Sequence, residues 1–283
     1  MNVLMVGTSK GSFRMRGIQI GAALGARVKR RPTDADWRWA DVVVLVKHAG
    51  LEWAHQAHRF HVPIIWDVLD CWRQPEDNAW TVEQGKVFVA GLASRIKPTA
   101  MIAATQQMAS DIGGVYIPHH CRIGLRPTPP REQVTVVGYD GQKKYLGRWL
   151  DAVSAECARR GWRFVINPPN LPDVDILVAF RDGKWDGPLC RAWKSGVKHV
   201  NALCAGRPIV TQRVSACEEL SRNWTLVEDA RQLAGALMVS ADSTSRHCAF
   251  SDGKARSAQF TVESLVANYY RPLLERVASR VAA

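Results

Sequence analysis

Hydrophobic residues along the chain follow two alternating patterns: short runs rich in β-branched residues, and longer stretches with helical periodicity. The short runs predict strands at 2–6, 26–29, 42–46, 63–66, 101–104 and 115–117. Helical stretches separate them at 14–24, 51–60, 82–96 and 105–112. Strands that alternate with helices are typical of a parallel, doubly wound sheet, so residues 1–125 are predicted to form one Rossmann-like α/β domain.

A proline-rich stretch, RPTPPREQ, interrupts this alternation at residues 126–133. Its prolines neither continue a helix nor fit inside a sheet, so we expect an interdomain linker. The alternation then restarts, with an amphipathic helix at 143–160 and strands at 134–137, 163–166, 176–179, 208–211 and near Leu226. We therefore predict a second Rossmann-like domain over 134–260, facing the first across a cleft, and a last helix within 261–283.

One segment of the second half, KSGVKHVNALCAGRPIV at residues 194–210, points to a binding function. A helix here places Lys194, Lys198 and Asn201 within about 60° of one another, since each residue turns the helix by about 100°. Gly206 and Pro208 end that helix. This side of the helix offers two ammonium groups, an amide and, at the helix start, free N–H groups, all of which can bind a diphosphate. The alternative is that these residues form a basic face exposed to solvent.

Composition adds a charge argument. The 283 residues carry a formal net charge of +12, which indicates a polyanionic partner or simply a basic surface. The seven cysteines lack metal-binding spacing and are typical of reduced thiols, so together with the absence of an apolar span or leader we expect a cytoplasmic protein. Dinucleotide-binding GxGxxG, Walker A and GxSxG motifs are absent, which argues against an NAD-dependent oxidoreductase, a P-loop NTPase and a hydrolase.

The segment at 194–220, KSGVKHVNALCAGRPIVTQRVSACEEL, resembles the nucleotide-sugar-binding segment of GT-B glycosyltransferases. Other stretches are similar to this family's Gly-rich loop and Arg-bearing helix (VGTSKGSFRMRGIQIGAAL), its Asp-bearing strand end (VPIIWDVLDCW) and its strand before the hinge (YIPHHC). The last stretch, FTVESLVANYYRPLLERV, resembles the helix that crosses back over the N-terminal domain. The resemblance covers nearly the whole chain and implies the GT-B fold.

This resemblance implies a donor site for a nucleotide sugar, with UDP-glucose as the default donor. The residues expected to bind it are Gly11, Ser12, Arg14, Arg16, Gly138, Gly141, Arg181, Lys194, Ser195, Lys198, Asn201 and Glu218. The arginines are alternatively surface side chains, and the glycines are alternatively tight turns. The chain departs from the retaining pattern because the E-x7-E element is reduced to Glu218 and Glu219, which favours an inverting enzyme.

Catalysis by such an enzyme needs a base for the acceptor hydroxyl, and Asp67 and Asp70 are the candidates because they follow a hydrophobic strand. Each is alternatively a cap or an ion-pair partner. His119 and His120 are expected near the acceptor or packed at the hinge. The Asp-x-Asp triplets at 34–36 and 173–175 are alternatively ligands of a divalent cation, but the first lies in a polar, Trp-containing connection and the second precedes a strand, which is typical of a turn. Because lysine and arginine neutralise phosphate, we expect no metal requirement.

The expected acceptor rests on the net charge and on what the resemblance implies. Compact GT-B enzymes include those that glycosylate hydroxymethylated bases in phage DNA, and a phage-encoded enzyme of this kind works in the host cytoplasm. Trp66, Trp72 and Trp80 are expected to stack on an extruded base, and phosphate contacts are expected from Arg27, Arg30, Arg31, Arg38, Arg73, Arg95, Arg122, Arg126 and Arg131. The alternatives are a polysaccharide or lipid-linked acceptor, and a non-catalytic nucleic-acid-binding module.

Overall fold

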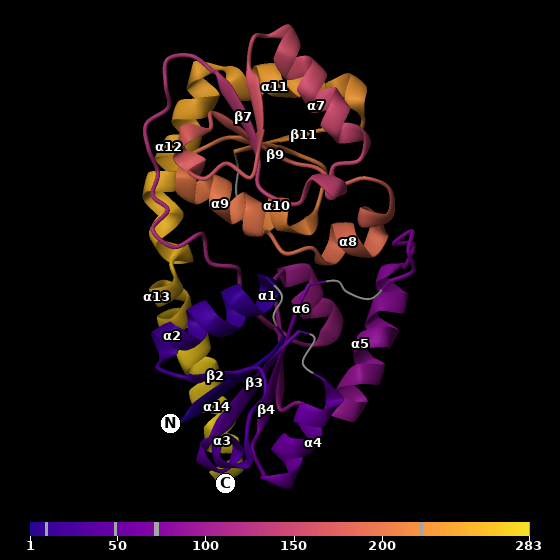
Figure 1. Cartoon of the computed structure of the whole chain (residues 1–283), viewed down its shortest axis with the longest axis vertical. Coiled ribbons are helices and arrows are strands. Elements are labelled where there is room, and N and C mark those ends of the chain that lie inside the picture. Colours follow the sequence, from indigo (N-terminus) through magenta and orange to yellow (C-terminus); the bar gives the residue numbers. More distant parts are fainter. Residues whose placement is uncertain (9–10, 48–49, 71–73, 221–222, 283) are drawn as a thin grey trace. The chain divides into compact units, whose positions relative to one another are not determined.

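A computed structural model describes residues 1–8, 11–47, 50–70, 74–220 and 223–282. The chain divides into two compact units, whose elements are labelled in Figure 1. Unit 1 comprises Met1–Cys71, Val82–His120 and Val262–Ala283, and unit 2 comprises Trp72–Thr81 and Cys121–Thr261. The division thus falls between His120 and Cys121, ahead of the proline-rich stretch, and the short excursion at 72–81 belongs with the second unit.

Unit 1 contains a parallel sheet with the strand order β2-β1-β3-β4-β5-β6. The strands are β1 (Val3–Val6), β2 (Arg27–Lys29), β3 (Val42–Val46), β4 (Ile64–Leu69), β5 (Ala100–Ala103) and β6 (Val115–Tyr116). They match the predicted runs to within a few residues. The exception is β4, which continues past Trp66 through Asp67 because Val68 and Leu69 extend the apolar run.

The helices of unit 1 begin with one continuous helix made of α1 (Gly11–Phe13), the π-helical turn η1 (Arg14–Gln19) and α2 (Ile20–Leu24). Gly7 and Gly17 make room for the buried ring of Phe13, because a Cβ at either position would lie within 2.3 Å of that ring. The other helices are α3 (Asp34–Trp39), α4 (Leu51–Arg59), α5 (Val82–Ile96), α6 (Gln106–Ile112), α13 (Val262–Leu265), the π-helical turn η7 (Val266–Tyr270) and α14 (Arg271–Ala282).

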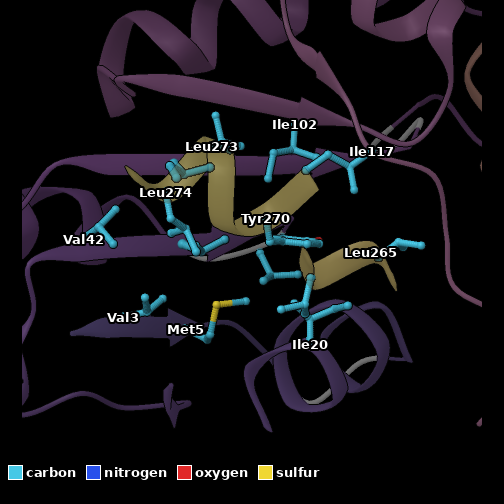
Figure 2. Packing of buried hydrophobic residues seen from close by; sticks show 14 of the residues in the cluster. Val3, Met5, Ile20, Val42, Ile102, Ile117, Leu265, Tyr270, Leu273 and Leu274 are labelled. Atoms are coloured by element: carbon cyan, nitrogen blue, oxygen red, sulfur yellow. The ribbon is translucent and has the colours of Figure 1, made fainter. Parts of the chain in front are cut away.

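The core of unit 1 joins the start of the chain to its end. Figure 2 shows Tyr270, Leu273 and Leu274 packed among side chains of the strands, including Val42 and Ile102. These side chains are at most 3% exposed. Each buried aliphatic or aromatic side chain contributes about 1.5–3 kcal/mol of burial free energy, so the C-terminal helix is an integral layer of this unit.

Unit 2 contains a second parallel sheet, with the order β11-β10-β9-β7-β8. The strands are β7 (Val136–Tyr139), β8 (Arg163–Ile166), β9 (Ile176–Ala179), β10 (Ile209–Thr211) and β11 (Trp224–Leu226). From β7 the chain crosses to β8 on one side, and from β9 it crosses to β10 on the other side. Two parallel doubly wound sheets confirm the prediction of two Rossmann-like domains.

The helices of unit 2 surround this sheet. They are α7 (Arg148–Arg159), α8 (Pro188–Trp193), α9 (Val197–Ala205), α10 (Ser215–Leu220), α11 (Leu233–Ala241) and α12 (Ser243–Arg256), with 3₁₀ turns η2 (Lys143–Tyr145), η3 (Leu171–Asp173), η4 (Gly183–Trp185), η5 (Ala230–Gln232) and η6 (Ser257–Phe260). Within the described part of the chain, no helix combines the length and the hydropathy needed to cross a bilayer.

Candidate donor site and acceptor-side residues

A pocket of about 140 Å³ lies at the carboxyl edge of the second sheet, where β9 and β10 end. Its lining includes Arg181, Lys194, Ser195, Lys198 and Gln212. Four of the residues that the sequence predicted for the donor site, Arg181, Lys194, Ser195 and Lys198, are therefore brought together here. The walls also contain apolar side chains, which lowers the local dielectric and strengthens any charge interaction inside.

Lys194 and Lys198 line this pocket from two separate backbone segments, whereas the sequence predicted that they lie on one helix. Residues 194–205 do not form one helix: α8 ends at Trp193, Lys194 has an extended backbone with ψ 124°, and α9 begins after Gly196. The prediction of one helical row of Lys194, Lys198 and Asn201 is wrong. The break lies where the chain packs closely against another helix, since a Cβ at Gly196 would lie 2.1 Å from Leu220 on α10.

Lys198 is the most perturbed cation of the pocket. Its ammonium donates to the backbone carbonyl of Asp140 and lies 4.4 Å from the centroid of the Tyr139 ring. Burial lowers the pKa of Lys198 to about 7; Asp140 opposes this change, and the nearby charges of Arg181 and Lys194 add to it. An anion placed against Lys198 would restore its full charge.

His199, the next residue, is not a second cation. Burial and the charge of Lys198 lower the pKa of His199 to about 4, so its ring is neutral at pH 7. Its Nε2 lies 3.2 Å from the Sγ of the buried Cys217 on α10. His199 also lines the pocket, and this contact joins α9 to α10 at the pocket wall.

Asn201 does not face a ligand. It is 3% exposed, its Oδ1 accepts from the backbone N–H of Arg122 at 2.9 Å, and its Nδ2 donates to Asp140 at 2.9 Å. Arg122 also donates to the other Asp140 oxygen at 2.5 Å. The prediction that Asn201 binds the diphosphate is therefore corrected. Its amide holds the turn at Asp140 in place, and the Asp140 carbonyl accepts a hydrogen bond from Lys198.

The two glycines predicted for the donor site have packing roles. Gly138 lies inside β7, and a Cβ there would approach Val174 to 2.8 Å, so this glycine allows close packing and does not line the pocket. Gly141 follows the strand, its N–H donates to Asn167, and a Cβ there would lie 2.4 Å from the Lys198 ammonium. Gly141 thus leaves room for that lysine.

Glu218 lies outside the pocket. Its exposed carboxylate pairs with Arg213 at 2.6 Å. The pocket contains polar residues that the sequence did not single out: Asp186, which Arg191 binds at 2.8 Å, and Gln212, whose Oε1 accepts from the backbone N–H of Arg181 at 2.8 Å. Gln212 directly follows β10, and this position was the only sequence signal for it, whereas Asp186 lies beyond η4 and no sequence pattern indicated it.

In unit 1, Asp67 and Arg16 have structural roles. Both are 0% exposed, and Arg16 Nε lies 3.2 Å from Asp67 Oδ2. Arg16 also donates to the carbonyls of Ile117 and Pro118 at 2.8 and 2.9 Å, and the Tyr270 hydroxyl donates to Asp67 at 3.4 Å. The predictions of Asp67 as the base and Arg16 as a phosphate ligand are corrected, because neither side chain is accessible to a substrate.

Asp70 lies at the carboxyl end of β4, beyond a bulge between Asp67 and Leu69. Its side chain is 4% exposed, and its carboxylate forms an ion pair with Lys47, which follows β3. Leu69 and Lys47 have φ angles of 71° and 50°, which are costly for residues with a Cβ. Such strain persists where the surrounding structure requires it, and it is frequent at functional sites. Lys47 was not predicted, although it directly follows the run VVVLV.

The predicted acceptor-side aromatic and histidine residues are mostly inside. Trp66 is 0% exposed and its indole N–H donates to the Lys47 carbonyl, so Trp66 does not stack on a ligand. Trp72 lies outside the described residues. His119 and His120 are buried, and His120 Nε2 lies 3.2 Å from the Met15 carbonyl. Their burial agrees with the second of the two sequence interpretations, in which these histidines pack at the hinge and do not bind the acceptor.

The remaining predicted donor-site residues lie in unit 1, and the Asp-x-Asp triplets lie in caps and turns. Gly11 and Arg14 are exposed and Ser12 is half-buried, near the start of α1. Asp36 forms a capping box with Thr33 at the start of α3, and Asp175 accepts from the backbone N–H groups of Thr135 and Val136. The Asp-x-Asp triplets thus contribute capping and turn interactions.

The two parallel sheets, with a cationic pocket at the carboxyl edge of the second, define an α/β protein with the fold of the GT-B glycosyltransferases. No family model and no curated protein matches the sequence. Among solved structures, the trehalose-6-phosphate synthase OtsA is similar over 97% of this chain and 99% of its own, with 10% identity and a TM-score of 0.63.

Two further solved structures share this fold. The spinosyn rhamnosyltransferase SpnG, complexed with thymidine diphosphate, is similar over 96% of this chain and 100% of its own, with 12% identity and a TM-score of 0.54. TarM from S. aureus, in complex with UDP and alpha-GlcNAc-glycerol, is similar over 84% of this chain, with 11% identity and a TM-score of 0.56. The chain spans only 58% of TarM. At these identities the likeness shows the fold alone.

Proposed function

We propose that this protein is a nucleotide-sugar-dependent glycosyltransferase that binds the diphosphate of its donor in the pocket of unit 2. The observation that carries this proposal is the convergence of Arg181, Lys194 and Lys198 on one pocket at the carboxyl edge of a doubly wound sheet. The likeness to SpnG and TarM supports it, since their structures contain thymidine diphosphate and UDP.

The same three cations supply what glycosyl transfer needs from the donor side. When the bond between the anomeric carbon and the diphosphate breaks, the diphosphate leaves with the electron pair and gains negative charge. Ammonium and guanidinium groups fixed in an apolar-walled pocket stabilise that charge without reorganising. This arrangement makes a divalent cation unnecessary, and we propose a reaction without one.

On the acceptor side we propose Asp70 as the base of an inverting reaction. Its carboxylate takes the proton of the acceptor hydroxyl while the hydroxyl oxygen attacks the anomeric carbon from the face opposite the leaving diphosphate. Lys47 is a positioning residue, because its ion pair holds the Asp70 carboxylate at the end of β4. The transferred sugar is a hexose, with UDP-glucose as the first donor to test.

For the acceptor we propose a hydroxymethylated base in DNA. The support is the net charge of +12, which suits a polyanion. A gel-shift assay with hydroxymethylated DNA, run beside a pull-down with anionic vesicles, distinguishes this acceptor from a lipid-linked one. Binding to vesicles alone would favour the lipid-linked or polysaccharide acceptor.

A thermal-shift titration with UDP, thymidine diphosphate and UMP tests the donor site. A diphosphate at 100 times its Kd stabilises the protein by about 2.7 kcal/mol, and the monophosphate should give less. Lys198→Met should abolish the shift, whereas Lys254→Met, a substitution of an exposed lysine on α12, should preserve it. Absence of a shift with every nucleoside diphosphate would contradict the proposal.

A further inference from the structure

Two short turns of unit 2 bring an aromatic pair together with cations. The Tyr145 ring, in η2, lies 4.8 Å from the Trp185 ring, in η4, at an interplanar angle of 70°. Lys144 Nζ lies 5.6 and 5.2 Å from the centroids of the two rings, Lys184 Nζ lies 5.5 Å from that of Trp185, and Arg181 Cζ lies 5.1 Å from that of Tyr145. These five residues are called the aromatic–cation cluster below.

The cluster occupies a position where doubly wound sheets bind ligands. The turn η2 follows β7 and η4 follows β9, and these two strands are neighbours from which the chain departs in opposite directions. Such a switch point leaves a crevice outside the carboxyl ends of the strands. Arg181 belongs both to the cluster and to the lining of the donor pocket, so the two sites adjoin.

The positive charge of the cluster is not neutralised locally. No carboxylate in the described part of the chain forms an ion pair with Lys144 or Lys184. The nearest acidic residues along the chain have other partners, since Asp140 pairs with Arg122, Asp182 with Arg148 and Asp186 with Arg191. Both lysines are exposed, and both rings are half-buried.

We infer that the aromatic–cation cluster is a contact surface for single-stranded or extruded DNA, whose bases meet Tyr145 and Trp185 while its phosphates meet Lys144 and Lys184. Aromatic rings interleaved with cations suit this ligand because every base has a stacking face and every nucleotide carries a phosphate. The inference deepens the proposed function and rests on it for a role in catalysis. It replaces the predicted stacking residue Trp66, which is buried, with Tyr145 and Trp185 of unit 2.

The test is a fluorescence-anisotropy titration with a labelled oligo(dT), without any nucleotide sugar, at several salt concentrations. Trp185→Ala should weaken binding roughly 5- to 150-fold, the loss expected for one stacked base, whereas Trp185→Phe should retain most of it. The double variant Lys144→Ser, Lys184→Ser should lower the slope of log affinity against log salt by about 0.7 for each phosphate contact removed.

The matched control is Lys254→Ser. This lysine is also exposed and lies 5.6 Å from an aromatic ring, that of Phe250, but it belongs to α12. Lys254→Ser removes one positive charge, as the single variant Lys144→Ser does, but outside the cluster. The oligo(dT) affinity of Lys254→Ser should therefore change little, whereas that of Lys144→Ser should fall. If Lys254→Ser weakens binding as much as Lys144→Ser, or if polyphosphate of equal charge competes as well as oligo(dT), the contact is unspecific and the inference is wrong.

The thermal shift by UDP, measured on the same variants, separates this inference from the proposed function. Loss of oligo(dT) binding by Trp185→Ala with an unchanged UDP shift supports the inference. Loss of both places the cluster in the donor site and overturns the inference, as does wild-type protein that does not bind oligo(dT). Oligo(dT) binding through the cluster in a protein that UDP does not stabilise would support the contact surface and contradict the proposed enzyme.

Discussion

At the scale of single residues, two buried aspartates, one in β4 and one directly after it, have different partners. Asp67 lies within β4, is wholly buried and pairs with Arg16, whereas Asp70 follows the bulge and pairs with Lys47 at the strand end. The π-helical turns η1 and η7 contribute Arg16 and Tyr270 to the Asp67 side. π-Turns shift the register of a helix, so they place these side chains where a regular helix would not.

Asp67→Asn should destabilise the protein strongly. The substitution leaves Arg16 buried without its anionic partner, and breaking a buried pair costs about 3–5 kcal/mol. Tyr270→Phe, which removes one hydrogen bond to the same carboxylate, should cost about 1 kcal/mol. Urea unfolding measures both, and a cost for Asp67→Asn below that of Tyr270→Phe would show that the pair adds nothing to stability.

Asp70→Asn should affect transfer while leaving donor binding intact. Removing a general base slows a reaction by about 10²- to 10⁴-fold, and Asp70 belongs to the other unit from the donor pocket. The measurement is UDP release from the donor in the presence of acceptor, beside the UDP thermal shift. Full activity in Asp70→Asn would remove Asp70 from the mechanism.

Lys198 should make stability and donor binding depend on pH in opposite directions. Its pKa falls from 10.5 to about 7 on folding, so between these values the unfolded chain binds more protons than the folded one. The contribution of Lys198 to stability therefore increases as the pH rises through this window. A bound diphosphate favours the charged form, so UDP affinity should decrease from pH 7 to pH 9.

Calorimetric titration in buffers of different ionisation enthalpy measures the proton uptake that this argument requires. Near pH 8, UDP binding to the wild-type protein should be accompanied by uptake of a fraction of a proton by Lys198. This uptake should be lost in Lys198→Met, which has no titratable group at position 198. An affinity that is constant between pH 7 and pH 9 in wild type would contradict the role of Lys198.

At the scale of elements, close packing determines where helices begin and end. The chain breaks between α8 and α9 where Gly196 lies against α10, and α12 approaches α9 because Gly253 has no side chain. A Cβ at Gly253 would lie 2.5 Å from the Leu203 carbonyl. The sequence predicted a good helix through 194–205, but helical periodicity carries no information about a neighbouring helix.

Two glycine substitutions test this packing, because helix propensity favours alanine over glycine by about 1 kcal/mol at both positions. Gly235, in α11, has open space around it, so Gly235→Ala should raise the free energy of unfolding by up to that amount. Gly253→Ala should lower it, since α9 must move away from the new methyl group. Chemical denaturation measures both, and equal stabilisation would show that α9 and α12 are not in tight contact.

At the scale of the whole molecule, the charge is shared between the units. Unit 1 carries 16 Lys and Arg against 10 Asp and Glu, and unit 2 carries 22 against 16, so each has a net charge of +6. Most of the arginines predicted to bind phosphate lie in the first half of the chain, but unit 1 does not carry a larger net charge than unit 2. This even distribution is consistent with a DNA contact in unit 2.

The C-terminal helix should be required for unit 1 to fold. A chain that ends at Thr261 lacks Leu265, Tyr270, Leu273 and Leu274, which pack against the sheet of this unit. The loss of several buried side chains, each contributing about 1.5–3 kcal/mol, is comparable to the whole stability of a domain. Limited proteolysis should then degrade residues 1–120 while unit 2 resists, and equal resistance of both units would contradict this prediction.

The sequence by itself determined the order of strands and helices along the chain, because strand periodicity and helix periodicity are local properties of neighbouring residues. It also indicated that Arg181, Lys194, Ser195 and Lys198 serve one site, since carboxyl ends of parallel strands meet at one edge. Tertiary structure alone decided that Asp67, Arg16, Asn201 and Trp66 are buried. Burial and pairing depend on residues distant in the chain, such as Tyr270 for Asp67 and Arg122 for Asn201, and no local pattern encodes those neighbours.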